Sequence, residues 1–364
     1  MILNISDSEF KRIFTDEQFH LPIRWDNRDF AETLRRLFLA YESKIKELRL
    51  GYERGEIPVD AKRIRRVNNL LVRAVEQYLD GFPETAFRTF GRLMMVLEER
   101  PLKTYDKSVR EQFEEYKDPL NLYRVTRVTD NIPYGRDRVF HTPYYLRSKV
   151  STSRYSIAGF PSLYLGTSLE LCCEEVQINP HEHFTIASRF QLNRDFERHN
   201  IEINVIELGI KPQDFLSIDR ENNYLRNRTV SRDVLKKLDI YGAYLLWYPL
   251  IAACSFIRVN KKDPFAPEYI IPQLLMQWVR IKMRTSKEEH DRLVGIRYFS
   301  CASVRASDMG FNYVFPSSGQ QTTASFCPVL SKAFKLTKPC FLHEYRDIYL
   351  CEEALRKNND LRFV

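Results

Sequence analysis

The sequence lacks the patterns that mark several common classes of protein. It has no Gly-x-Gly-x-x-Gly segment and no P-loop, which argues against nucleotide binding of the Rossmann or P-loop kind. No uncharged apolar run reaches about 18 residues, and the N-terminus lacks an apolar core of the signal-peptide type. We therefore expect no membrane contact and a cytoplasmic location.

Cysteine is present but forms no recognisable framework. The seven cysteines are odd in number and contain no Cys-x-x-Cys spacing. Both facts argue against structural disulfides and against a zinc site, and they favour reduced thiols in a cytoplasmic protein. The seven are Cys172, Cys173, Cys254, Cys301, Cys327, Cys340 and Cys351.

Composition predicts a folded chain that prefers anionic ligands. Of the 364 residues, 44% are hydrophobic and 29% are charged, which is enough to bury a substantial core. The 56 Lys and Arg against 48 Asp and Glu give a net charge of +8. Because this excess is spread along the chain without a polybasic tail, it argues against a nucleic-acid partner.

Residues 1–118 predict a helical domain. Apolar residues recur at steps of three and four residues over 34–48, 64–78 and 87–97, with Asp60 as an N-cap and Pro83 in a first turn. The basic side chains of Arg63, Arg65 and Arg66 lie opposite the apolar stripe, which favours a solvated face. We place the domain boundary at residues 118 and 119.

Residues 119–364 predict a second domain of mixed structure. Strand patterns cover 122–128, 162–165, 185–192, 203–210 and 294–300, and helical patterns cover 168–176 and 272–282. Residues 233–254 are largely apolar, and Pro249 predicts a kink between two buried helical turns. The fold class expected for the whole chain is α+β.

The residues between 122 and 176 carry the chemistry. Arg124, Arg127 and Arg154 can each donate paired hydrogen bonds to phosphate oxygens, which lysine cannot match. Tyr155 and Tyr164 offer aromatic faces for a nicotinamide or adenine ring. For each one alone, a surface ion pair or a tethered core tyrosine is the ordinary alternative.

Glu175 is the candidate catalytic carboxylate. It lies on a predicted helix whose other face is formed by Leu169, Cys172 and Val176, so it is expected at the border between the core and a cleft. A carboxylate there can stabilise an oxocarbenium-like transition state at a ribose. Glu174 points about 100° away on a helix and is expected to be structural.

The histidines give weaker signals. His141, in Phe-His-Thr-Pro, can bind a phosphate or a ribose, although a satisfied structural histidine is the alternative. His181-Glu182-His183 lacks a third ligand at a recognisable spacing, so we expect no metal.

Taken together, these motifs resemble the RES domain, a family called after its Arg, Glu and Ser. The resemblance covers roughly Leu122 to Ser300, with Phe315 as its outer limit. It rests on Tyr-Arg at Arg124, Arg-Tyr-Ser at Arg154, Leu-Tyr-Leu-Gly at Tyr164, Cys-Glu-Glu-Val at Glu175 and the Ser300 segment. It departs from small RES toxins in two ways: they often carry Arg-Trp-Asn-Pro where this chain has Arg154-Tyr155-Ser156-Ile157, and the insertion after Glu175 is long.

The resemblance implies a fold and a site. RES domains resemble ADP-ribosyltransferases, so the core would be a split, mainly antiparallel sheet with flanking helices. Arg124 and Arg154 would contact the pyrophosphate or nicotinamide ribose of NAD, Tyr164 would pack on the nicotinamide, and Glu175 would stabilise charge on the ribose. Ser300 would bind near that ribose, with Ser317 as its rival.

The resemblance also implies a function. The leading hypothesis is an enzyme that consumes NAD as substrate, cleaving the nicotinamide–ribose bond with water or phosphate, and acts as a toxin or anti-phage effector. One alternative is ADP-ribosyl transfer to a protein or nucleic acid, and another is a non-catalytic binding protein that works through its helical domain. A toxin in its own cytoplasm would need an antitoxin or regulatory partner.

Overall fold

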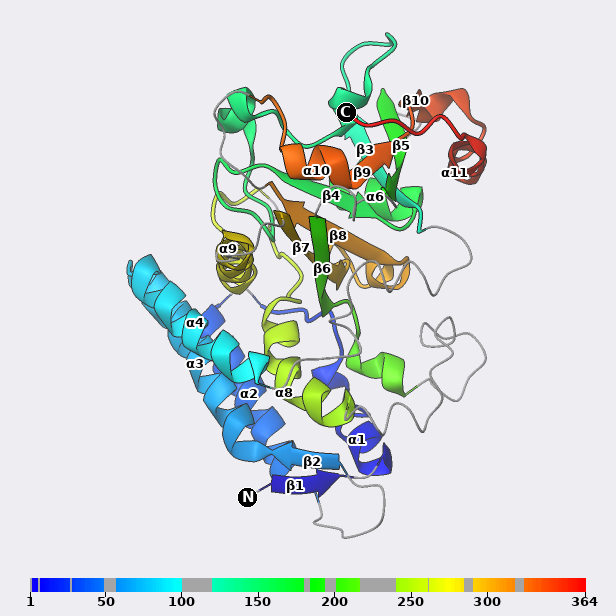
Figure 1. Ribbon diagram of the computed structural model, residues 1–364. Coiled ribbons are helices and arrows are strands. Elements are labelled where there is room, and N and C mark those ends of the chain that lie inside the picture. Colours follow the sequence, from blue (N-terminus) through cyan, green and yellow to red (C-terminus); the bar gives the residue numbers. More distant parts are fainter. Residues whose placement is uncertain are drawn as a thin grey trace. The chain divides into compact units, whose positions relative to one another are not determined.

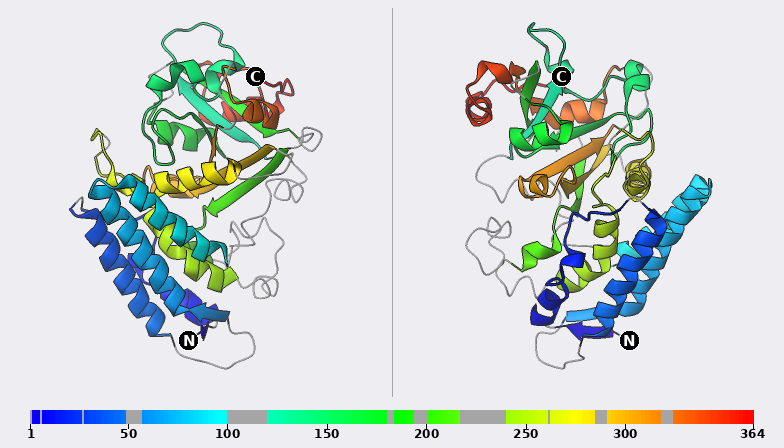
Figure 2. Two further views of the ribbon diagram at one scale, coloured as in Figure 1. Left: turned by 60° about the vertical axis from the view of Figure 1, so that its left-hand side comes forward. Right: turned by 180° about the vertical axis from the view of Figure 1, so that it is seen from behind.

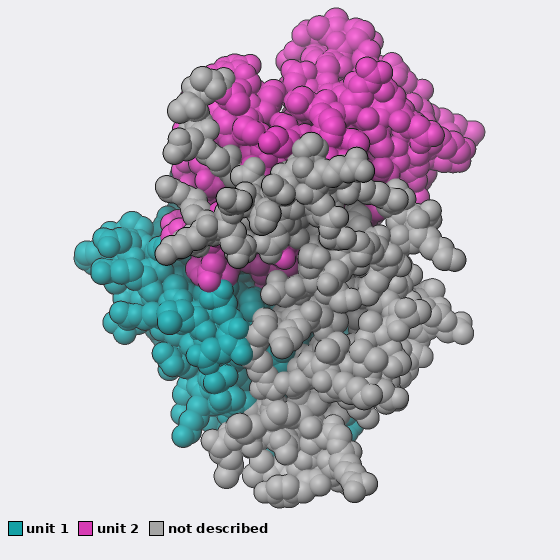
Figure 3. Space-filling model, viewed as in Figure 1, with its two compact units in different colours: residues 1–106, 210–275 teal, residues 107–209, 276–364 magenta. Residues whose placement is uncertain are grey.

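The chain forms two compact units that alternate along the sequence. The computed structural model describes residues 2–5, 7–26, 28–48, 57–99, 120–179, 184–193, 201–216, 240–260, 262–284, 291–317 and 324–364. Unit 1 comprises residues 1–106 and 210–275, and unit 2 comprises residues 107–209 and 276–364 (Figure 3). The sequence prediction placed one boundary at residues 118 and 119, which lie outside the described residues.

Unit 1 is built on the predicted helices. Helices α2 (Phe30–Lys46), α3 (Ala61–Leu79) and α4 (Pro83–Glu98) confirm the three periodic segments, and α2 and α4 flank α3 (Figure 2). Asp60 caps α3 as expected, since its carboxylate accepts a hydrogen bond from the Arg63 backbone N–H at 3.0 Å. The short helix α1 (Asp7–Ile13) and an antiparallel pair, β1 (Ile2–Ile5) and β2 (Ile57–Asp60), complete the N-terminal part.

Helix α8 (Ile240–Ala253) explains why residues 210–275 belong to unit 1. All its side chains from residue 241 onward are buried, as expected for a helix that is apolar on every side. Its tyrosines find hydrogen-bond acceptors in unit 1: the Tyr248 hydroxyl donates to the Phe19 carbonyl at 3.1 Å, and the Tyr244 hydroxyl to the Ile210 carbonyl at 2.9 Å. The helix runs through Pro249 as one element rather than as two separated turns.

Unit 2 contains a mixed sheet of eight strands in the order β10-β5-β3-β4-β8-β7-β6, with β9 paired to β5 (Figure 1). Among the described pairs, β6 and β7 are parallel and the others antiparallel. This arrangement confirms the α+β class. The strands are β3 (Leu122–Arg127), β4 (Ser162–Gly166), β5 (Thr185–Leu192), β6 (Ile201–Leu208), β7 (Asp291–Phe299), β8 (Phe311–Pro316), β9 (Phe334–Leu336) and β10 (Cys340–Phe341).

Short helices cover this sheet. They are α6 (Leu169–Val176), α10 (Pro328–Ala333) and α11 (Ile348–Lys357), while α9 (Ile270–Arg284) contains the boundary between the units. One buried cluster joins α6 and α11 to β3 through Tyr123, Leu169, Cys172 and Leu355. Elements beyond residue 300 were not predicted from the sequence.

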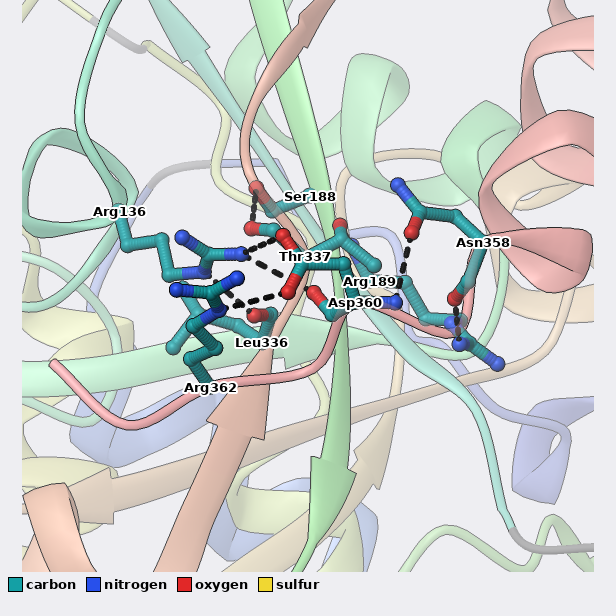
Figure 4. Close-up of polar contacts among 8 residues, drawn as sticks. All are labelled: Arg136, Ser188, Arg189, Leu336, Thr337, Asn358, Asp360 and Arg362. Carbon is teal, nitrogen blue, oxygen red and sulfur yellow. Dashed lines mark hydrogen bonds and ion pairs between the residues drawn. The ribbon is translucent and has the colours of Figure 1, made fainter.

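The end of the chain is held against β5 and β9 by arginines (Figure 4). Arg136 donates to the Leu336 carbonyl at 2.9 Å and to the Asp360 carboxylate at 2.7 Å. Arg189 donates to the Asn358 carbonyl at 2.5 Å. These contacts join segments far apart in sequence, so arginine here serves the fold rather than a ligand.

Two further observations concern the cysteines and the helices. All seven cysteines are free of disulfide bonds. Within the described part of the chain, none of the helices has the length and apolar character needed to span a membrane.

A buried ion pair joins β6 to β7. Arg297 Nη1 donates to Glu207 Oε2 at 2.8 Å, and these side chains are 5% and 1% exposed. The two residues are direct partners in the parallel register. The Arg297 guanidinium also lies 4.1 Å from the centre of the Phe311 ring.

Removing one partner of this pair should destabilise unit 2 strongly. Glu207→Ala leaves the Arg297 charge buried without its carboxylate, so we expect a loss of about 3–5 kcal/mol in the free energy of unfolding. The control is Arg305→Ala, which removes an exposed ion pair with Glu170 and should cost at most about 1 kcal/mol. Denaturant unfolding checks both values, and similar small losses in the two variants would contradict the prediction.

Candidate active site

The sheet of unit 2 is nearly divided between β3 and β4. These strands share a single pair, Tyr123 with Gly166, whereas β3 pairs with β5 along its whole length and β4 does so with β8. Each half therefore has its own hydrogen-bonded partners. The predicted site residues Arg124 and Tyr164 lie on the two strands that meet at this joint.

Gly166 allows a helix to pack closely on the joint. A Cβ atom at Gly166 would lie 2.7 Å from Cys172 Sγ, so any other residue would push α6 away. Cys172 Sγ in turn donates to the Tyr123 carbonyl at 3.2 Å. Helix α6 is thereby fixed to both sides of the joint.

Helix α6 presents Glu175 in its last turn. Ser168 caps the helix, since its hydroxyl accepts from the Leu171 N–H at 3.2 Å, and Gln177 ends it in the left-handed conformation with a φ of 53°. Leu169, Cys172 and Cys173 are buried, while Glu174 and Glu175 are half-buried. Glu175 thus lies at the border of the core, whereas Val176, which the sequence analysis placed on the apolar face of this helix, is exposed.

Asn312 holds the Glu175 carboxylate, and the sequence analysis missed it. Asn312 Nδ2 donates to Glu175 Oε1 at 2.6 Å. Asn312 lies on β8 opposite both Gly166 and Tyr298, and it is 5% exposed. A lone asparagine within the aromatic segment 311–315 was the signal that could have revealed it, because buried amides need partners.

Tyr298 connects several of the predicted residues electrostatically. Burial raises its pKa well above the ordinary value, and the charge of Glu175 and the phenol of Tyr164 raise it further, while Arg154 opposes the rise. Arg154 and Tyr298 are themselves buried. The structure therefore brings Arg154, Tyr164 and Glu175 into one neighbourhood around Tyr298.

The two predicted aromatic residues have different surroundings. Tyr155 is 1% exposed and packs on Tyr298, with ring centres 4.7 Å apart, so its ring belongs to the core. Tyr164 is half-buried, and its hydroxyl donates to the Tyr155 carbonyl at 2.5 Å. Of the two rings, only that of Tyr164 is partly exposed, and its hydroxyl fixes the Arg-Tyr-Ser turn to β4.

Arg124 is a half-buried cation with one buried nitrogen that has no partner among the described residues. Its Nη1 is inaccessible to solvent and has no hydrogen-bond partner in the described part of the chain. Burial lowers its pKa to about 10. A buried guanidinium that lacks partners is costly, so this nitrogen is suited to an incoming anion. Arg127, by contrast, is exposed at the end of β3.

His141 is used inside the protein. Its Nε2 accepts from the Cys327 N–H at 2.8 Å, so its Nδ1, 2.8 Å from the Thr142 carbonyl, carries the proton and donates. The side chain is fully buried. Both ring nitrogens are occupied, which favours the structural alternative for this residue over ligand binding.

Ser300 and Ser317, the two candidates for the serine of the RES resemblance, differ in their hydrogen bonds. Both are fully buried. The Ser300 hydroxyl accepts from the Ala302 N–H at 3.1 Å and so closes a local turn. Ser317 Oγ makes no well-formed hydrogen bond within the described residues, although it lies beside the Tyr144 hydroxyl, which leaves Ser317 better suited to a ligand than Ser300.

The described residues contain no group of three or more His, Cys, Asp or Glu side chains placed to hold a metal ion. His181, Glu182 and His183 lie outside those residues.

Protonation of His141 should destabilise the fold as the pH falls. Burial lowers its pKa to about 4, the Thr142 carbonyl opposes this shift, and Arg124 adds to it. The unfolded chain, with a pKa of about 6.5, then binds the proton more readily, so stability is lost between about pH 6.5 and pH 4. We expect about 2 kcal/mol less stability from this group at pH 5 than at neutral pH.

Denaturant unfolding at the two pH values measures this loss, and His141→Gln is the control because its side chain does not titrate. An equal pH dependence in the variant and the unsubstituted chain would contradict the prediction.

The chain is similar in sequence to a known protein. It is 28% identical over 310 residues to a protein of Bacillus subtilis (strain 168) named "Putative toxin YopC". The match covers 83% of this chain and 64% of that protein, so the chain spans less than two thirds of this relative's length. Because the match is longer than either unit, it includes residues of both. No family model and no solved structure matches the chain.

Proposed function

We propose that the chain is an enzyme that cleaves NAD at the nicotinamide–ribose bond and acts as a toxin. The observation that carries the proposal is the carboxylate of Glu175, held at 2.6 Å by Asn312 beside the joint of a split sheet. In support, Arg124 and Tyr164 lie on the two strands that meet at this joint, and Arg154 and Tyr164 both act on the charge state of Tyr298. The relative named as a toxin supports the biological role.

The chemistry follows from these groups. When the bond between ribose C1′ and the nicotinamide nitrogen breaks, its electron pair leaves with nicotinamide, which becomes neutral, and positive charge develops on the ribose. Glu175 would stabilise that charge, and the amide of Asn312 would keep the carboxylate aimed at it. Water or phosphate then attacks C1′ and releases a proton.

The arginines would hold the substrate. The pyrophosphate of NAD carries two negative charges, and guanidinium groups bind such oxygens through paired, charge-assisted hydrogen bonds. Arg124 has a buried nitrogen available for this role. The half-buried ring of Tyr164 would pack on the nicotinamide.

Glu175→Gln should abolish NAD consumption without unfolding the protein. Glutamine keeps the size of the side chain and removes the charge, so turnover should fall by about 100-fold or more. Glu174→Gln is the matched control, because it makes the same change one residue away on α6 and should leave turnover near that of the unsubstituted chain. The measurement is loss of NAD by the purified full chain, with products identified by mass, with and without phosphate.

The products separate the possible acceptors. Free ADP-ribose would indicate water, its phosphorylated form would indicate phosphate, and label retained on protein or nucleic acid would indicate ADP-ribosyl transfer. Undiminished turnover by Glu175→Gln would overturn the mechanism.

Asn312 should act as a positioning residue. Asn312→Ala removes a hydrogen bond to a charged group, which is worth about 1.5–3 kcal/mol and corresponds to roughly a 10- to 100-fold lower kcat. KM should change little, since Asn312 is not expected to contact NAD. In the Glu175→Gln background the same substitution should add little further loss. Multiplicative losses in the double variant, with both proteins folded by thermal unfolding, would show that Asn312 does not act through Glu175.

A further inference from the structure

A second group of buried polar atoms in unit 2 has no partner. The atoms are Arg147 Nε and Nη2, Ser162 Oγ and Ser317 Oγ, all inaccessible to solvent and without hydrogen bonds to the described residues. Burying a polar group without a hydrogen bond costs free energy, so one such atom is uncommon and several together need an explanation.

The fold brings these residues to one place. Ser162 is on β4, whose partner in β8 at that position is Pro316, and the Ser317 N–H donates to the Pro161 carbonyl at 3.1 Å. Tyr144 lies next to both Arg147 and Ser317. The Arg147 guanidinium lies 5.4 Å from the centre of the Tyr144 ring, and Ser317 neighbours the Tyr144 hydroxyl.

Ser317 and a second cation, Arg280, lie near Tyr144 and affect its pKa. Burial raises the pKa of Tyr144 to about 12, with the Cys327 thiol adding to the rise. The neighbouring Ser317 hydroxyl and the charge of Arg280 oppose it. Ser317 and Tyr144 are thus neighbours, although their hydroxyls make no well-formed hydrogen bond.

The donors suit a phosphate group. Nε and Nη2 form one edge of the guanidinium, where two N–H bonds point the same way and can bind two oxygens of one anion. The serine hydroxyls add two further donors. Arg280 brings additional positive charge, since its guanidinium donates to the Ser317 carbonyl and lies 4.5 Å from the centre of the Phe160 ring.

Charge favours phosphate over a carboxylate. No acidic side chain of the described residues pairs with Arg147. Two guanidinium groups close to two hydroxyls match an anion with more than one negative charge and with oxygens in several directions.

We propose that Arg147, Ser162 and Ser317, a set that does not include Glu175 or Asn312, form a binding site for a phosphate group. The phosphate belongs either to free inorganic phosphate, as the acceptor of the cleavage, or to the pyrophosphate of NAD. Both assignments rest on the proposed function, whereas the phosphate site itself does not.

Inorganic phosphate tests the site directly. The full chain carrying Glu175→Gln, which prevents turnover, is titrated with phosphate by calorimetry, alone and with Arg147→Ala added. We expect Arg147→Ala to weaken phosphate binding by at least about tenfold, and Arg147→Lys to restore only part of it because lysine lacks the paired donors. Lys149→Ala is the matched control, since Lys149 is an exposed cation of the same 3-10 helix, Tyr144–Lys149.

Thermal unfolding separates binding from a structural role. Among the described residues, Arg147 loses only its contact with the Tyr144 ring when it is replaced by alanine, so Arg147→Ala should unfold at most a few degrees earlier than its parent in the absence of phosphate. It should also lose the stabilisation that phosphate gives to the parent. A larger destabilisation without phosphate, together with unchanged stabilisation by phosphate, would overturn the proposal.

Binding of NAD and of nicotinamide riboside, which lacks phosphate, distinguishes the two sources. If Arg147→Ala weakens NAD but not nicotinamide riboside, the site holds the pyrophosphate. If it weakens inorganic phosphate alone, the site holds the acceptor. Unchanged affinity for both phosphate and NAD overturns the proposal. If phosphate binding depends on Arg147 but the unsubstituted chain consumes no NAD, the proposed function fails and the site remains.

Discussion

The single pair between Tyr123 and Gly166 is the constraint on which the candidate site depends. A continuous ladder between β3 and β4 would use the backbone groups of both strands along their length. Because the ladder is reduced to one pair, the two halves of the sheet separate beside it, and α6 packs onto the joint through the space that Gly166 leaves. The position of Glu175 follows from that packing, since the helix is only eight residues long and is fixed at its start by Ser168.

The arginines of unit 2 fall into two groups according to their hydrogen-bond partners. Arg297, Arg136 and Arg189 have carboxylate or carbonyl partners and join segments distant in sequence. Arg124 and Arg147 also have buried nitrogens without partners, as Arg189 and Arg297 do at Nε, but no carboxylate or carbonyl among the described residues accepts a hydrogen bond from Arg124 or Arg147. An unsatisfied buried donor costs free energy, and at Arg124 and Arg147 no other hydrogen bond of the same side chain to the described residues offsets that cost. A bound anion would supply the missing hydrogen bonds at both.

Unit 1 depends on a segment supplied from far along the chain. Helix α8 is apolar on all sides and carries tyrosines whose hydroxyls donate to carbonyls of Phe19 and Ile210. The amphipathic N-terminal helices have apolar faces that need such a partner. An independent N-terminal domain would have left those faces without α8, which is why the units interleave rather than follow one another.

The sequence by itself determined the local elements, since hydrophobic period, Asp60, Pro83 and Ser168 act over a few residues and mark where α3, α4 and α6 begin. It also determined the residue types of the site: Arg124, Arg154, Tyr164 and Glu175 were chosen from their chemistry. Only the tertiary structure decided how each is used. It buries Tyr155 on Tyr298, occupies both nitrogens of His141, leaves Ser317 unpartnered among the described residues and sets Asn312 on Glu175. The physical reason is that a hydrogen bond or a desolvation cost depends on neighbours in space, and residues such as Glu175 and Asn312 are 137 positions apart in the chain.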